Sequence, residues 1–142
     1  MLRGEIEDVL VRYAWAFDED DFDTMRTLFT EDGTFEVSEP TVDVIRGPEA
    51  IIAFQKTARE ARAGRGEQPR HLVNNVRIVE VEADAVTAVS YMTLVITLAD
   101  GTSKVALAGT YNDRLVKQGG AWRIATRQLT FDRHQVSVPA TE

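Results

Sequence analysis

The stretch that decides the fold is AVTAVSYMTLVITLADGTSKVALAGTYNDRLVK, residues 85–117 of the chain. It contains two long runs rich in Val, Ile and Thr, residues 85–98 and 103–117, and an Asp-Gly pair at 100–101 separates them. Beta-branched residues favour strands, and an Asp-Gly pair between two such runs is a strong hairpin signal. The sequence therefore predicts two long antiparallel strands joined by a short turn.

Similar runs lie on both sides of this hairpin. Residues 71–81 precede it, with a turn signal at 83–84, and residues 121–132 follow it after the Gly-Gly pair at 119–120. Strands joined by such short connections pair in antiparallel fashion. We therefore expect a four-stranded antiparallel meander with roughly ten or more residues per strand.

The beginning of the chain has helical periodicity instead. Apolar residues recur at helical spacing in residues 5–17, with charged residues on the other side. Asp20 or Asp21 can then cap a second short helix, in which the apolar stripe runs from Phe22 to Phe29.

A short strand and a third helix are expected before the meander. Residues 30–33 have the composition of a turn, and residues 34–37 alternate like a strand. Pro48 is suited to the first turn of a helix, which we expect to run to about Thr57, with a frayed end and a loop over residues 58–68. Helices followed by a meander predict an α+β fold with the helices on one face of the sheet.

Composition limits the classes of function. The 142 residues fit one domain, and the net charge of −7 disfavours nucleic acid or another polyanion as a partner. The absence of cysteine excludes disulfides, thiolate catalysis and cysteine-based metal sites, and two histidines argue against a histidine metal cage. No metal site is expected.

The sequence shows no targeting or membrane segment. Residues 1–8 are charged where a signal peptide would be apolar, and the most apolar run, residues 86–98, is interrupted by Thr and Ser and too short to span a bilayer. We expect a soluble, cytoplasmic protein.

Several short motifs accompany this order of elements. They are Arg12-Tyr13-Ala14, LFTEDGTF at 28–35, RGPEAI at 46–51, Arg70-His71, GTYND at 109–113 and GAWRI at 120–124. Over residues 5–132 the chain resembles the SnoaL-like group of the nuclear-transport-factor-2-like (NTF2-like) superfamily. The resemblance implies a cone-shaped, curved antiparallel sheet whose wide end is closed by the N-terminal helices around an apolar pocket. We expect one domain, residues 1–132, and a polar C-terminal tail, residues 133–142.

The resemblance also implies a catalytic set, because three residues match those of dehydratase-type members of the superfamily. His71 would be the general base, Asp18 would orient it, and Tyr13 would donate a hydrogen bond to a substrate oxygen. Histidine has a pKa near neutrality, a carboxylate fixes its tautomer, and a phenol can stabilise developing charge. Tyr13 and Asp18 lie about 140° apart on an ideal helix, so both face one cavity only if they flank its mouth or if the helix unwinds near Asp18.

Two weaker candidates for substrate binding complete the set. Asn75 shares a strand face with His71 if the register is unbroken. Arg127 resembles a late-strand arginine that lies near the site in some dehydratases.

The sequence leaves the function open among three possibilities. The first is a cofactor-independent lyase that eliminates water from a small hydrophobic oxygenated substrate of polyketide, steroid or terpenoid character. The second is a non-catalytic module of the same fold that binds a small molecule or dimerises, and the third is an isomerase or cyclase that uses the same pocket. No phosphate-binding loop, dinucleotide-binding turn or other cofactor motif is present, so no cofactor is expected.

An apolar outer strand face predicts self-association. Threonine, valine and tyrosine alternate on one face of residues 87–95, which is too apolar for free solvent. We expect a homodimer or homotrimer.

Overall fold

The four long strands of the second half form most of one sheet. The structure, a computed structural model, describes residues 1–133, so the expected tail from residue 134 onward lies outside the described residues. The strands are β3 (Gln68–Val81), β4 (Ala85–Thr97), β5 (Ser103–Gln118) and β6 (Ala121–Phe131), and each is antiparallel to the next. The predicted meander is confirmed.

Two further strands extend the sheet beyond β6. β1 (Phe29–Val37) lies beside β6, and the two-residue β2 (Ile45–Arg46) lies outside β1, which gives the order β2-β1-β6-β5-β4-β3. The prediction of a turn at residues 30–33 is wrong, because these residues continue β1 across a register shift between Phe29 and Thr34. β1 also runs parallel to β6, so one pair departs from the antiparallel pattern.

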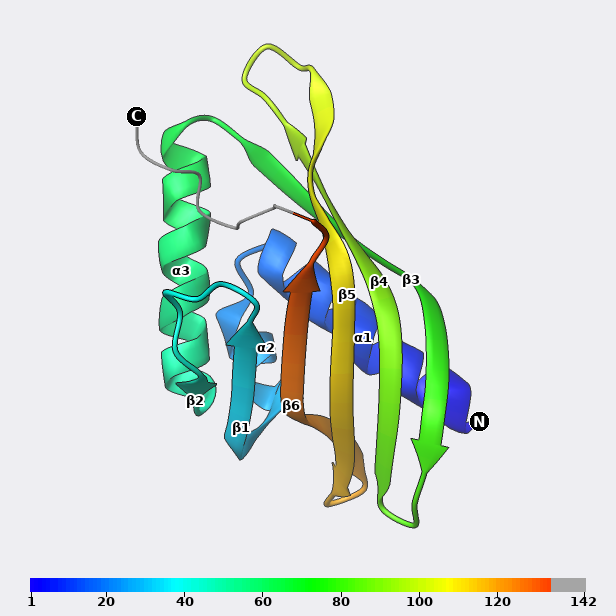
Figure 1. Cartoon of the computed structure of the whole chain (residues 1–142). Coiled ribbons are helices and arrows are strands. Elements are labelled where there is room, and N and C mark those ends of the chain that lie inside the picture. Colours follow the sequence, from blue (N-terminus) through cyan, green and yellow to red (C-terminus); the bar gives the residue numbers. More distant parts are fainter. Residues whose placement is uncertain (134–142) are drawn as a thin grey trace.

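Three helices cover one side of this curved, open sheet (Figure 1). α1 (Leu2–Asp18) crosses behind the long strands, α2 (Phe22–Leu28) follows it, and α3 (Pro48–Gly64) stands beside β1 and β2. The α+β class and the placement of the helices on one face are confirmed.

The ends of the helices follow from local chemistry. Asp21 caps α2, since its carboxylate accepts hydrogen bonds from the backbone N–H of Thr24, at 3.1 Å, and from the hydroxyl of Thr24, at 2.7 Å. α3 does not end near Thr57 as expected. It continues to Gly64 because residues 58–63, Ala-Arg-Glu-Ala-Arg-Ala, are all strong helix formers.

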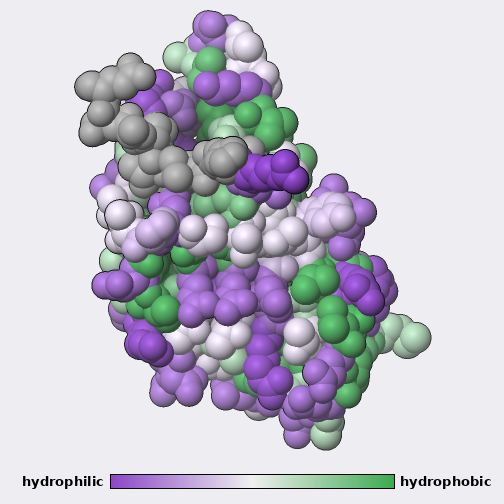
Figure 2. Space-filling view, in the orientation of Figure 1, coloured by the Kyte–Doolittle hydropathy of each residue, from purple (hydrophilic) through white to green (hydrophobic). Residues whose placement is uncertain are grey.

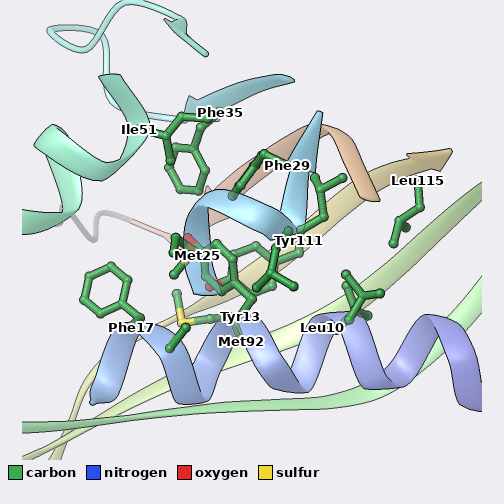
Figure 3. Close-up of a cluster of buried hydrophobic side chains, with 14 of the residues drawn as sticks. Leu10, Tyr13, Phe17, Met25, Phe29, Phe35, Ile51, Met92, Tyr111 and Leu115 are labelled. Carbon is green, nitrogen blue, oxygen red and sulfur yellow. The ribbon is translucent and has the colours of Figure 1, made fainter. Parts of the chain in front are cut away.

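The core lies between the helices and the concave side of the sheet. Along most of β4 the buried side chains alternate with more exposed ones, so Met92, Leu94 and Ile96 point inward. Figure 3 shows Tyr13 and Phe17 projecting from the same side of α1 into this core. Hence both a helix and the sheet contribute walls to any cavity at this end of the core.

The convex side of the sheet carries hydrophobic residues that remain exposed. Figure 2 shows this side, where hydrophobic patches are interspersed among hydrophilic residues. The exposed hydrophobic residues of β3, β4 and β5 are Leu72, Val79, Val81, Tyr91 and Val105. Within residues 1–133, none of the helices has the length and apolar character required to cross a membrane.

Candidate functional site

A largely apolar pocket that is partly open to solvent lies between α1, α3 and the sheet. Its volume is about 230 Å³, which is below the range of about 300–1,000 Å³ typical of drug-sized ligands, so it suits a compact molecule. Its apolar wall includes Phe17, Phe35, Phe54, Leu94, Leu107 and Phe131. Its polar groups are few, and they come from both helices and from the start of β3.

His71 forms part of the pocket wall and contacts Asp18 behind it. The Nδ1 atom of His71 lies 2.6 Å from Oδ1 of Asp18, and the backbone N–H of His71 donates to Oδ2 at 2.9 Å. The two side chains are only 8% and 7% exposed. A carboxylate oxygen accepts a hydrogen bond at this position, so the contact favours the tautomer with hydrogen on Nδ1, and in the neutral ring of that tautomer the lone pair is on Nε2. The contact expected between these two residues is therefore present, while a catalytic role for them remains a prediction.

Local structure explains why this contact forms. Asp18 is the last residue of α1, and α1 packs along β3, where His71 lies near the start of the strand. The neighbouring Phe17 ring lies 4.5 Å from the imidazole, centroid to centroid. Phe17 thus packs against the imidazole of His71, while Asp18 contacts its Nδ1 atom. Together these two contacts restrain the orientation of the ring.

Tyr13 also lines the pocket, but Asp18 does not. Asp18 lies instead in a separate hollow between α1 and β3, together with Trp15 and Leu72, and His71 separates that hollow from the pocket. The angle of about 140° between Tyr13 and Asp18 on an ideal helix left open whether both residues face one cavity. Tyr13 and Asp18 face different cavities, and His71 borders both.

The hydroxyl of Tyr13 is part of a buried polar group. Its oxygen accepts a hydrogen bond from Nε2 of Gln55 at 3.0 Å, and both residues are almost fully buried. Burial raises the pKa of the Tyr13 phenol, although the positive charge of Arg127 and the bond from Gln55 partly oppose this. The phenol therefore keeps its proton at neutral pH and can donate it in a hydrogen bond.

Arg127 lies beneath the pocket and does not line it. Its Nε and Nη2 donate to the two carboxylate oxygens of Asp113 at 2.8 and 3.0 Å, and both side chains are 0% exposed. The guanidinium carbon lies 4.2 Å from the Tyr13 ring centroid and 3.6 Å from that of Tyr111. The expectation of a substrate contact is corrected accordingly: an ion pair and two aromatic faces enclose Arg127, so it supports the pocket wall.

Burial and the charge of Asp113 have opposite effects on the pKa of Arg127. Burial alone would lower the pKa of Arg127, but the attraction of Asp113, with a smaller effect of Tyr111, raises it above its ordinary value. Burial raises the pKa of the Tyr111 phenol as well. The guanidinium of Arg127 therefore stays charged, and the two phenols stay neutral.

Asn75 is not brought to the pocket. The register between β3 and β4 shifts after Asn74, and Asn75 has a φ of +53°, which marks a β-bulge. The bulge turns Asn75 to the exposed side, where it borders a shallow hollow next to α1. The condition on which its predicted shared face with His71 depended, an unbroken register, is not met, and Asn75 does not line the pocket.

Two important residues were missed at the level of sequence. Gln55 occupies the buried face of α3, and its Oε1 has no hydrogen-bond partner within residues 1–133. Asp113 is an acidic residue at an inward position of β5, paired in register with Arg127 on β6. In both cases the available signal was a polar residue at a position where the periodicity demands an apolar one.

Metal ligands are not gathered anywhere in the part of the chain that the structure describes. Residues 1–133 contain no group of three or more His, Asp or Glu side chains positioned to hold a metal ion. The polar groups of the pocket are a base, neutral hydrogen-bonding groups and arginines, a set suited to proton transfer and to binding oxygen atoms.

Comparisons with known proteins agree with this architecture. The family model of the SnoaL-like domain matches residues 2–128. A solved structure of Rv3472, a Mycobacterium tuberculosis protein of unknown function, is 33% identical with a TM-score of 0.79, over 91% of this chain and 70% of that one. A Catenulispora acidiphila protein is 30% identical with a TM-score of 0.80, over 92% and 91% of the two chains.

A third comparison concerns the fold alone. An NTF2-like protein with a cystatin-like fold from Novosphingobium aromaticivorans is 21% identical with a TM-score of 0.81, over 95% of this chain and 84% of that one. None of the curated proteins matches the chain. The fold class expected from the sequence is confirmed.

Proposed function

The chain belongs to the SnoaL-like domain family, and from this premise and the site geometry we propose that it is a cofactor-independent lyase. It would eliminate water from a compact, hydrophobic substrate that carries a hydroxyl group β to a carbonyl group. The observation that supports this most directly is the 2.6 Å contact between His71 and Asp18, with the imidazole in the wall of an apolar pocket.

His71 is proposed as the general base. The carboxylate of Asp18 holds the ring with Nε2 unprotonated, so Nε2 can accept a proton from the carbon between the hydroxyl-bearing carbon and the carbonyl. When the ring becomes an imidazolium, the adjacent carboxylate stabilises its charge. Asp18 thus acts on His71 and not on the substrate, which agrees with its position outside the pocket.

Tyr13 and Gln55 are proposed to bind the substrate oxygens. The neutral phenol of Tyr13 can donate a hydrogen bond to the carbonyl oxygen as negative charge develops there. The unpartnered Oε1 of Gln55 can accept the hydrogen of the substrate hydroxyl. A buried acceptor without a partner is costly, so a ligand that satisfies it gains affinity.

The elimination then proceeds with its protons balanced. Nε2 of His71 takes the proton from carbon, and the electron pair of that C–H bond forms the carbon–carbon double bond. The C–O bond breaks, and the leaving oxygen takes the proton from the imidazolium, so that water departs and the ring returns to its neutral form. The enzyme ends each turnover in the protonation state in which it began.

The test uses a chromogenic elimination. We expect the protein to convert 4-hydroxy-4-phenylbutan-2-one to the conjugated enone, which absorbs in the near ultraviolet. His71→Ala should reduce the rate by about 10²–10⁴-fold, the usual contribution of a general base, and Asp18→Asn should slow turnover by orders of magnitude as well. Tyr13→Phe should be milder, because it removes one hydrogen bond and keeps the packing.

Binding separates this proposal from the other possibility, a module that binds without turnover. The unreactive analogue 4-phenylbutan-2-one should bind the wild type and the His71→Ala variant with similar affinity, because the base acts mainly in the transition state. If the hydroxyketone binds but is recovered unchanged from the wild type, and all three variants bind it equally well, the pocket is a container and the catalytic assignment is wrong.

A further inference from the structure

Two arginines on the second half of α3, Arg59 and Arg62, and Arg65 directly after the helix differ in how their charge is compensated. Nε of Arg59 donates to Asp20 at 2.8 Å, and Nε of Arg65 donates to Glu67 at 2.5 Å. Arg62 lies between them in sequence, and within residues 1–133 its side chain has neither a hydrogen bond nor an ion pair. The structure therefore leaves one guanidinium of this group without an acceptor.

Arg62 is also the most buried of the three. It is 9% exposed and lines the pocket, whereas Arg59 does not line it. Burial lowers the pKa of Arg62, the charges of Arg65 and Arg59 act in the same direction, and only Glu67 opposes them. A largely buried cation that makes no ion pair within residues 1–133 is unfavourable, and an anionic ligand would reduce that cost.

The other charges near the pocket are already satisfied. Arg127 is neutralised by Asp113 beneath the pocket, and the carboxylate of Asp18 is bonded to His71 outside it. Arg65 lines the pocket too, but its Nε and Nη2 donate to the carboxylate of Glu67, which balances its charge. Among the described residues that line the pocket, Arg62 is therefore the charged group without an ion pair, which matches a ligand with a single negative charge.

The position of Arg62 also sets a length for the ligand. Gln55 and Arg62 are both buried, both line the pocket, and lie seven residues apart on α3. Seven residues of α-helix span about 10 Å, and two turns bring side chains to nearly the same face. A ligand that reaches both residues carries its charge at the opposite end from the oxygens bound near Tyr13 and Gln55.

We propose that the natural ligand of this pocket is a compact aromatic or alicyclic carboxylate whose carboxylate group pairs with Arg62. The planar guanidinium can donate two parallel hydrogen bonds to a carboxylate, a geometry that a neutral amide cannot accept. The inference rests on the pocket being the substrate site of the proposed function, and it adds the charge class of that substrate.

The test compares two ligands of nearly the same shape. Naphthalene-2-carboxylate and its neutral primary amide are titrated calorimetrically against the wild type, Arg62→Gln and the matched control Arg59→Gln. The wild type should prefer the carboxylate, and Arg62→Gln should lose about 10–100-fold of carboxylate affinity, as expected for hydrogen bonds to a charged group. The amide should bind both proteins equally, and Arg59→Gln should bind the carboxylate as the wild type does.

The unfolding of the ligand-free variants gives an independent measurement. Because Arg62 makes no ion pair within residues 1–133, Arg62→Gln should have the same melting temperature as the wild type or a higher one, and this also verifies that the variant folds. The inference is overturned if the wild type fails to bind naphthalene-2-carboxylate, if it binds the amide equally well, or if Arg59→Gln weakens carboxylate binding as much as Arg62→Gln. A carboxylate preference that depends on Arg62, combined with no turnover under any condition, would retain this inference and reject the lyase.

Discussion

Removing one partner of the buried ion pair beneath the pocket should strongly destabilise the fold. We consider Asp113→Asn, which conserves shape and removes the charge. In the wild type both oxygens of Asp113 accept hydrogen bonds from Arg127, at 2.8 and 3.0 Å, and neither side chain is exposed. The substitution therefore leaves a guanidinium without its counter-charge at a position that is closed to solvent.

The size of the effect follows from these contacts. Breaking a buried pair by removing one partner costs about 3–5 kcal/mol. The rings of Tyr13 and Tyr111, at 4.2 and 3.6 Å, offset part of this, since a desolvated cation–π contact contributes about 2 kcal/mol. Nη1 of Arg127 already lacks a partner within residues 1–133, so no spare acceptor is at hand. We expect a loss of about 3 kcal/mol in the free energy of unfolding.

Urea unfolding measures this change, and an exposed pair next to it serves as control. Arg114 contacts Glu82 at 3.2 Å, with side chains 44% and 48% exposed, so Glu82→Gln should change the free energy of unfolding by about 0–1 kcal/mol. The double variant Asp113→Leu/Arg127→Met should recover much of the loss, because it leaves no buried charge. If Asp113→Asn lowers the free energy of unfolding no more than Glu82→Gln does, this prediction is refuted, because Arg127 would then not depend on Asp113 as a buried counter-charge.

Two further predictions concern stability at low pH and self-association. Hydrogen bonds from the side chain and backbone of Thr24 lower the pKa of Asp21, so the cap adds stability above the ordinary aspartate pKa of about 3.9, and this is lost as pH falls through the lowered pKa. Asp21→Ala should therefore reduce the melting temperature at pH 7, and the difference from the wild type should shrink at low pH; a pH-independent difference in thermal unfolding would contradict this. The exposed Tyr91 and Val105 on the convex side of the sheet, 55% and 61% exposed, predict a homodimer or homotrimer. Light scattering should show an oligomer at micromolar concentration and a monomer for Tyr91→Asp/Val105→Asp, and a monomeric wild type would refute the prediction.

Much of the fold could be predicted from the sequence because its signals are local. The alternation in residues 85–117 and the Asp-Gly turn define a hairpin without reference to the rest of the chain. Helical spacing over residues 5–17 likewise identifies α1 and its buried face. The pairing of Asp18 with His71 was expected from resemblance to a family and not from the pattern of residues, because 53 positions separate the two.

Other features depend on contacts between distant segments, and the tertiary structure alone decided them. A bulge after Asn74 turns Asn75 away from the pocket. The alternation of apolar and polar residues in the sequence does not reveal where a strand contains one extra residue. The enclosure of Arg127 by Asp113 and two tyrosines requires the register of β5 against β6 and the packing of α1 on both. Arg62 shares its sequence pattern with the paired arginines on either side of it. The positions of the acidic side chains show which of the three makes no ion pair within residues 1–133. An ion pair requires an oxygen within a few ångströms, and sequence spacing alone does not set that distance.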